Sequence, residues 1–197
     1  MNLPNKITLS RLIMSFVFFV LVSFDDRSTL LWAETVFILA CVTDYFDGYF
    51  ARKMNLSTAF GRIADPFVDK VIICGGFALM AGRVGPHGAS LIQPWMVVVL
   101  ISREFLVSSI RGYAESHDIA FGAEMSGKIK AVLQMIALGC AVYFYAYNDL
   151  PIFPASASRW VTLVFIYSAL ALTLLSAVTY VLKAEKLFAT GEHGQGQ

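Results

Sequence analysis

Four aspartates in the first half of the sequence have the types and spacing of a site for a divalent cation. Asp44 and Asp47 are three residues apart and Asp65 and Asp69 are four apart, so each pair shares one face of a helix. A short polar connection, residues 53–59, makes the two segments antiparallel neighbours and brings the four carboxylates together. Carboxylate oxygens suit Mg²⁺, Mn²⁺ or Ca²⁺ better than zinc or copper. Without a cation, their mutual repulsion would protonate some of them.

The residues alone leave two other interpretations of these aspartates open. One is a path for protons or cations, and the other is structural ion pairing with the neighbouring basic residues, namely Arg52, Lys53, Arg62 and Lys70. The small residues Gly48, Ala51 and Gly61 lie among the acids and favour a bound ligand. Glycine costs a helix about 1 kcal/mol relative to alanine, and here small residues would let a flat group approach the backbone. Close helix packing explains any one of them.

The composition indicates that this cluster belongs to an integral membrane protein. Of the 197 residues, 57% are hydrophobic and 15% are charged, and the mean hydropathy is +0.66. Soluble domains are typically about 45–50% apolar and about 25% charged, so a soluble core cannot hold this excess. The formal net charge of +1 excludes a strongly basic nucleic-acid-binding protein, and no nucleic acid partner is expected.

Six apolar runs predict an all-α fold, a polytopic membrane protein with six transmembrane helices. The runs are approximately residues 12–24, 28–44, 67–82, 89–102, 131–148 and 160–182. Crossing a bilayer core takes about 20 helical residues, so the charged stretches beside the shorter runs are expected to continue the helices. Residues 2–10 are expected to form a short N-terminal interfacial helix. Residues 1–187 are predicted to form a single membrane domain, followed by a flexible tail over residues 188–197.

The basic residues predict the orientation in the membrane. With six spans, most of them fall on one side or near its ends: Lys6, Arg11, Arg52, Lys53, Arg62, Arg111, Lys128, Lys130, Lys183 and Lys186. Because basic residues are enriched on the cytoplasmic side, both termini and the aspartates are expected there, in a multi-pass protein of the cytoplasmic (inner) membrane. Asp44 lies about 12 Å of helix rise from Arg52, which places the site near the interface.

Together, the aspartates, the small residues and one arginine resemble the signature of the CDP-alcohol phosphotransferase family. The segment reads Asp44-x-x-Asp47-Gly48-x-x-Ala51-Arg52 and then, after eight residues, Gly61-x-x-x-Asp65-x-x-x-Asp69. The resemblance implies six transmembrane helices and a homodimer. It also implies one or two divalent cations, Mg²⁺ or Mn²⁺, that hold the diphosphate of a CDP-linked lipid.

Carried over by position, the resemblance implies a role for each residue of the signature. The metal ligands would be Asp44, Asp47, Asp65 and Asp69. Asp69 would also be the general base. The residues of the nucleotide site would be Gly48, Ala51 and Gly61 around the cytidine, with Arg52 near the nucleotide or diphosphate. The physical chemistry agrees, because metal ions on phosphate oxygens neutralise charge on the leaving group.

Cationic residues predict a phosphorylated acceptor. Arg103 and Arg111 lie near the end of the fourth predicted helix, and Lys128 and Lys130 open the fifth. Such side chains bind phosphate well, although anchoring at the membrane surface is the other interpretation. Three segments resemble those of bacterial phosphatidylglycerophosphate synthases within the family: Asn2-Leu3-Pro4-Asn5-x-x-Thr8-x-x-Arg11, Arg103-Glu104-Phe105-x-x-Ser108-x-x-Arg111 and Gly127-Lys128-x-Lys130-x-x-x-Gln134. The resemblance implies transfer of the phosphatidyl group of CDP-diacylglycerol to glycerol 3-phosphate, with these four cations on the acceptor phosphate.

Other functions stay open at this point. A cardiolipin synthase of the same fold would use phosphatidylglycerol as acceptor, and other members would use serine or inositol phosphate. A cation channel or transporter lined by the four aspartates is the alternative from another class, but it leaves the small residues and Arg52 unexplained. Three aromatic residues of the last helix are expected at the surface, as interfacial side chains or dimer contacts: Trp160, Tyr167 and Tyr180.

Overall fold

The computed structural model describes residues 3–54, 59–85, 88, 90–117, 125–147 and 155–192 of the 197-residue chain. Some side chains inside these ranges lie outside the description, at residues 3–5, 45–54, 59–63, 125, 126, 128, 155, 156 and 186–192. Every regular element of the described residues is an α-helix, which confirms the predicted all-α class.

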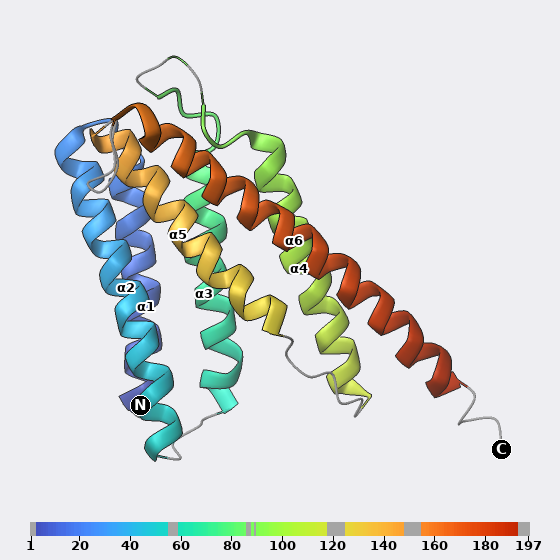
Figure 1. Ribbon diagram of the computed structural model, residues 1–197. Helices are drawn as coiled ribbons and strands as arrows, with labels where there is room; N and C mark the ends of the chain where they lie inside the picture. Colours follow the sequence, from blue (N-terminus) through green and yellow to red (C-terminus); the bar gives the residue numbers. More distant parts are fainter. Residues whose placement is uncertain are drawn as a thin grey trace.

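Six helices run alternately up and down, so that consecutive helices are antiparallel (Figure 1). They are α1 (Leu3–Val22), α2 (Arg27–Met54), α3 (Ala59–Met80), α4 (Pro94–Ser116), α5 (Met125–Tyr147) and α6 (Ala155–Glu192). This alternation gathers the start of α1, α3 and α5 and the end of α2, α4 and α6 at one end of the bundle, the lower end in Figure 1.

The first helix corrects the predicted interfacial helix. Residues 3–10 do not form a separate element, because α1 continues unbroken from Leu3 to Val22. Pro4 lies in the first turn, where its missing N–H costs nothing, and neither proline nor glycine follows before the helix ends. The last helix continues to Glu192, and the flexible tail over residues 188–197 stays a prediction.

Helices α3 and α5 connect the packing of the other helices. Helix α1 lies against α2 and α3, α5 lies against α6 and α2, and α4 packs mainly on α6. Two glycines bring α3 close to its neighbours. A Cβ atom at Gly75 would overlap the Phe19 ring of α1, and one at Gly76 would overlap Leu138 of α5. This close approach holds α1 and α5 against α3, and all three helices carry residues of the site.

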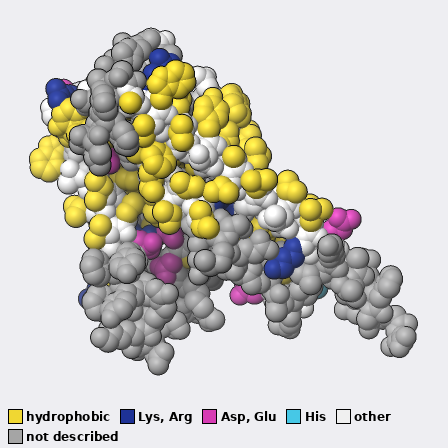
Figure 2. Space-filling view, in the orientation of Figure 1, with side chains coloured by type: hydrophobic (Ala, Val, Ile, Leu, Met, Phe, Trp, Pro, Cys, Tyr) yellow, Lys and Arg dark blue, Asp and Glu magenta, His cyan; other side chains and the backbone are white. Residues whose placement is uncertain are grey.

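The outer surface is apolar over most of the helices. Large side chains such as Phe16, Phe105 and Trp160 are 58%, 70% and 70% exposed. Figure 2 shows hydrophobic side chains over the upper part of one face, with most of its acidic side chains below them. Two helices of the described part are long and apolar enough to cross a membrane, over Ile129–Tyr147 and Ala157–Glu185. A soluble protein does not expose so much apolar surface, and a lipid bilayer is the solvent that suits it.

Candidate active site

Three of the four predicted carboxylates lie at the lower end of the bundle, where each contacts a side chain of α1. The guanidinium of Arg11 lies between two of them: Nη1 is 2.6 Å from Oδ1 of Asp44, and Nη2 donates to Oδ1 of Asp69. One turn earlier on α1, the Thr8 hydroxyl donates to Oδ1 of Asp65 at 2.5 Å. Arg11 is 3% exposed, so this ion-paired arrangement is shielded from solvent.

Sequence reasoning missed Arg11 and Thr8 as site residues. The sequence places Arg11 among the basic residues that orient the chain, and places both residues in the N-terminal segment of the family resemblance, but it assigns neither of them a role in the site. The signal that points to them is the segment before the first apolar run, in which threonine and arginine are three residues apart. On a helix this spacing places both side chains on one face, and α1 turns that face toward α2 and α3.

The donor set of this cluster fits a hard divalent cation. Asp44 and Asp69 share one cationic group, and the carboxylates supply only oxygen atoms, which Mg²⁺ and Mn²⁺ prefer. The Arg11 guanidinium occupies the space between the two carboxylates but does not match them fully. Its Nη1 is buried close to Asp44, yet it lacks a partner with hydrogen-bond geometry. No three His, Cys, Asp or Glu side chains of the described residues form a metal-binding group, and the Asp47 side chain is outside that set.

The predicted nucleotide residues lie outside the described side chains. Gly48, Ala51 and Arg52 belong to the last turns of α2, and Gly61 belongs to the first turn of α3. The backbone therefore brings all four to the end of the bundle that carries the aspartates. Their role at the cytidine stays a prediction, as does the role of Asp47 as a metal ligand.

A cavity of about 540 Å³ extends from Asp69 between α3, α4 and α5. Three of the four predicted acceptor residues line it, namely Arg103, Arg111 and Lys130. The side chain of Lys128, the fourth, is outside the description. The structure thus brings the cations of α4 and α5 to the same cavity as Asp69, the last aspartate of α3.

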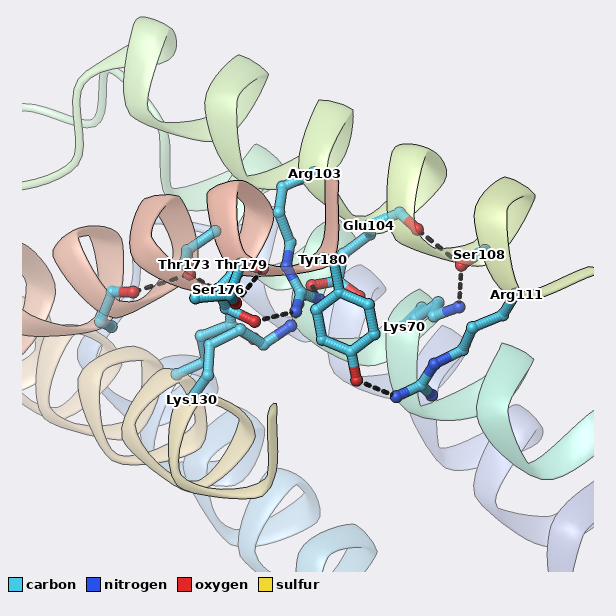
Figure 3. A network of polar contacts seen from close by, with 12 residues as sticks. Lys70, Arg103, Glu104, Ser108, Arg111, Lys130, Thr173, Ser176, Thr179 and Tyr180 are labelled. Carbon is cyan, nitrogen blue, oxygen red and sulfur yellow. Dashed lines mark hydrogen bonds and ion pairs between the residues drawn. The ribbon is translucent and has the colours of Figure 1, made fainter. Parts of the chain in front are cut away.

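Glu104 holds the inner wall of this cavity together (Figure 3). Its Oε1 accepts a hydrogen bond from Arg103 Nη1 at 3.1 Å and another from Lys130 Nζ. Arg103 Nη2 donates in turn to the Ser176 hydroxyl of α6 at 2.6 Å. Arg103, Glu104 and Lys130 are all less than 10% exposed. One carboxylate therefore balances part of the charge of two buried cations and joins α4 to α5, while Arg103 joins α4 to α6.

The burial of Tyr180 also differs from the prediction. The expectation that it lies at the surface is wrong: Tyr180 is 0% exposed, whereas Trp160 and Tyr167 are exposed as expected. Arg111 Nη2 donates to its hydroxyl, and the Arg111 guanidinium lies 5.1 Å from the ring centroid. Tyr180 is buried because the face of α6 that carries it packs against α4. The burial places its hydroxyl against Arg111, which lines the cavity.

Lys70 also lines the cavity, and its partner differs from the one in the ion-pairing interpretation. The sequence offers Lys70 as an ion-pair partner of the aspartates, but its Nζ donates to the Ser108 hydroxyl of α4 (Figure 3). Ser108 in turn donates to the Glu104 backbone carbonyl at 2.5 Å. The lysine that follows Asp69 therefore points along the cavity toward the α4 residues.

Comparison with known proteins identifies the family. A family model described as CDP-alcohol phosphatidyltransferase matches residues 1–175. A Bacillus subtilis (strain 168) protein named CDP-diacylglycerol–glycerol-3-phosphate 3-phosphatidyltransferase is 37% identical over 177 residues, which cover 83% of this chain and 89% of the relative. A Rickettsia typhi protein of the same name is 32% identical over 141 residues, covering 72% and 76%. An Oryza sativa subsp. japonica protein named cardiolipin synthase (CMP-forming) is 34% identical over 168 residues, covering 77% and 49%.

The match extends over most of the region in which the site is built. Residues 1–175 include the aspartates, Arg11 and the cations of the cavity, whereas Ser176 and Tyr180 of α6 lie beyond the matched range. The family resemblance read from the aspartate signature is confirmed. The chain belongs to the CDP-alcohol phosphatidyltransferase family.

Proposed function

We propose that this protein transfers the phosphatidyl group of CDP-diacylglycerol to glycerol 3-phosphate, giving phosphatidylglycerophosphate and CMP. The observation that carries the proposal is the cavity that joins Asp69 to Arg103, Arg111 and Lys130. It offers a base and a cationic pocket to one small acceptor. The names of the Bacillus and Rickettsia relatives support the same donor and acceptor.

The aspartates would hold the cofactor, one or two Mg²⁺ or Mn²⁺ ions. The ligands would be Asp44, Asp47, Asp65 and Asp69, and the carboxylates that converge on Arg11 support this assignment. When bound, such an ion neutralises charge on the diphosphate oxygens of the donor. Gly48, Ala51 and Gly61 would border the cytidine, with Arg52 near the nucleotide or diphosphate. These small residues leave room for a flat base beside the backbone.

The acceptor would be bound from the other side of Asp69. Arg103, Arg111, Lys128 and Lys130 would bind its phosphate and direct a hydroxyl group toward Asp69. Asp69 would accept the hydroxyl proton as the oxygen attacks the phosphorus nearer the diacylglycerol. The bond from that phosphorus to the oxygen of CMP breaks, and CMP leaves. General base catalysis of this kind contributes typically about 10²–10⁴-fold to a rate.

We also propose a membrane arrangement in which all six helices span the bilayer of the cytoplasmic membrane and residues 1–187 form one domain. Both termini and the active site would face the cytoplasm, and the protein would be a homodimer. The alternating helices and the two long apolar spans support this topology. The same arrangement would put a water-soluble acceptor at the interface and the acyl chains of the donor in lipid.

The test is CMP release by the purified full chain with CDP-diacylglycerol and Mg²⁺ or Mn²⁺. Glycerol 3-phosphate is compared with phosphatidylglycerol, inositol phosphate and serine as acceptor. We expect release only with glycerol 3-phosphate, and its loss when EDTA removes the metal. Release with phosphatidylglycerol alone would instead identify a cardiolipin synthase, which is the name of the Oryza sativa relative. Metal flux into vesicles without CMP release would identify an aspartate-lined channel or transporter.

A further inference from the structure

Among the described side chains, four cations line the cavity, and they differ in the partners that they bind. Arg103 and Lys130 bind the Glu104 carboxylate and are 7% and 4% exposed. Lys70 and Arg111 donate instead to hydroxyl groups and are more accessible. A carboxylate offsets the charge of a cation, whereas a hydroxyl does not. The positive charge available to an incoming anion is therefore concentrated on Lys70 and Arg111.

We propose that Lys70 is a ligand of the acceptor phosphate, together with Arg111. This inference rests on the proposed function, because it names a further residue of the same acceptor site. Lys70 is bound to Ser108, which lies three residues before Arg111 on α4. Residues three apart share a helix face, so the ammonium and the guanidinium flank one region of the cavity (Figure 3).

The position of Lys70 in the chain also suits a short acceptor. Glycerol 3-phosphate has three carbons, so its phosphate and its reacting hydroxyl must be bound by groups that lie close together. Lys70 directly follows Asp69, the proposed base, and both line the cavity. Arg103 and Lys130 lie in the buried inner wall, tied to Glu104. Lys70 is thus the cation whose backbone is next to the base.

Lys70 can exchange its hydrogen bond to the Ser108 hydroxyl for one to a phosphate oxygen. The ammonium group carries three donors, and a phosphate oxygen forms a shorter and stronger hydrogen bond with it than a neutral hydroxyl does. Of the acids that line the cavity, Asp69 is paired with Arg11, and Glu104 is paired with Arg103 and Lys130. Glu115, one turn beyond Arg111, also opposes an anion there, but it is exposed to solvent. Screening by solvent weakens its repulsion.

The test compares Lys70→Met with Lys70→Arg and with Lys6→Met. Lys6 is a matched control, an exposed lysine at the same end of the bundle that does not line the cavity. We expect Lys70→Met to raise the KM for glycerol 3-phosphate about 10–100-fold, the loss typical of one hydrogen bond to a charged group. The KM for CDP-diacylglycerol should stay within twofold, and Lys70→Arg should recover much of the loss.

A direct binding measurement separates this inference from the proposed function. Titration calorimetry of the full chain with glycerol 3-phosphate, and separately with inorganic phosphate, should show weaker binding to Lys70→Met and unchanged binding to Lys6→Met. An unchanged KM and unchanged phosphate binding in Lys70→Met would overturn the role of Lys70 while leaving the transferase intact. A raised KM for CDP-diacylglycerol alone would overturn it too, because Lys70 would then serve the donor. If the wild type releases no CMP with any acceptor, the proposed function fails, and phosphate binding still tests Lys70.

Discussion

Asp69 is the residue on which the proposed chemistry depends most directly. It is bound to Arg11, and it lies where the carboxylate cluster meets the acceptor cavity. We expect Asp69→Asn to lower the rate of CMP release by about 10²–10⁴-fold, because an amide cannot accept the hydroxyl proton. The control is Asp26→Asn, at the opposite end of the bundle, which should keep the wild-type rate. Normal CMP release by folded Asp69→Asn would refute the mechanism.

Arg11 is the counter-ion of two of the predicted metal ligands, Asp44 and Asp69. Its guanidinium is nearly buried between Asp44 and Asp69, whose side chains are 34% and 39% exposed. In EDTA, Arg11→Met should lower the free energy of unfolding by about 1–2 kcal/mol, the value of a partly screened ionic hydrogen bond. A scan of thermal unfolding in detergent would measure this as a lower midpoint.

The response to metal gives Arg11→Met a second readout. Mg²⁺ or Mn²⁺ should raise the unfolding midpoint of the variant more than that of the wild type, because the ion restores the positive charge that the variant lacks. Equal midpoints for the two proteins in EDTA would show that Arg11 is not the counter-ion of the acids.

At the scale of the helices, Glu104 of α4 connects three elements. It binds Lys130 of α5 and its neighbour Arg103, and Arg103 in turn binds Ser176 of α6. Glu104→Gln keeps the shape but leaves two buried cations without a counter-charge. We expect it to cost about 3–5 kcal/mol of stability, as breaking a buried ion pair does. Adding Lys130→Met to Glu104→Gln should recover part of the loss in the unfolding midpoint. A double variant less stable than Glu104→Gln would contradict this account of the charges.

Close packing of α3 is the second feature of the helices that can be tested. A methyl group at Gly76 would overlap Leu138 and touch Phe18, both fully buried, so neither can move aside. Gly76→Ala should therefore destabilise the protein by about 1–3 kcal/mol through overpacking. Gly112→Ala is the matched control, because beyond its own stretch of α4 no heavy atom of the described residues lies within 4 Å of its Cβ position. That variant should gain up to about 1 kcal/mol from helix propensity, measured by the same thermal scan.

For the whole molecule, the alternation of six helices predicts that the two ends of the bundle lie on opposite sides of the membrane. After Cys41, Cys74 and Cys140 are replaced by alanine, Asp26→Cys and Glu185→Cys report the two ends. In right-side-out vesicles, an impermeant maleimide should label residue 26 and not residue 185. Inverted vesicles should show the reverse. Labelling of both positions from the same side would refute the six-span topology.

Much of the fold and part of the site follow from local patterns along the chain. The aspartate pairs, the helices that carry them and the cations that open α5 depend on helical periodicity and on long apolar runs, which act over a few turns. Each is a property of neighbouring residues, and so it was predictable. The prediction of a separate interfacial helix over residues 2–10 was wrong, because polarity alone does not end a helix, and a polar segment without a breaker continues it.

The contacts that complete the site depend on which helix faces meet. Arg11 binds acids 33 and 58 residues away in the chain, and Lys70 binds a hydroxyl 38 residues away. Tyr180 is buried because its face of α6 packs against α4, although its spacing in an apolar helix equally fits a lipid-facing residue. Local periodicity places a residue on a helix, but only packing between helices selects its partner. The composition and the spacing of the aspartates thus indicate the family, whereas the counter-ion of those aspartates and the wall of the acceptor cavity come from the packed bundle.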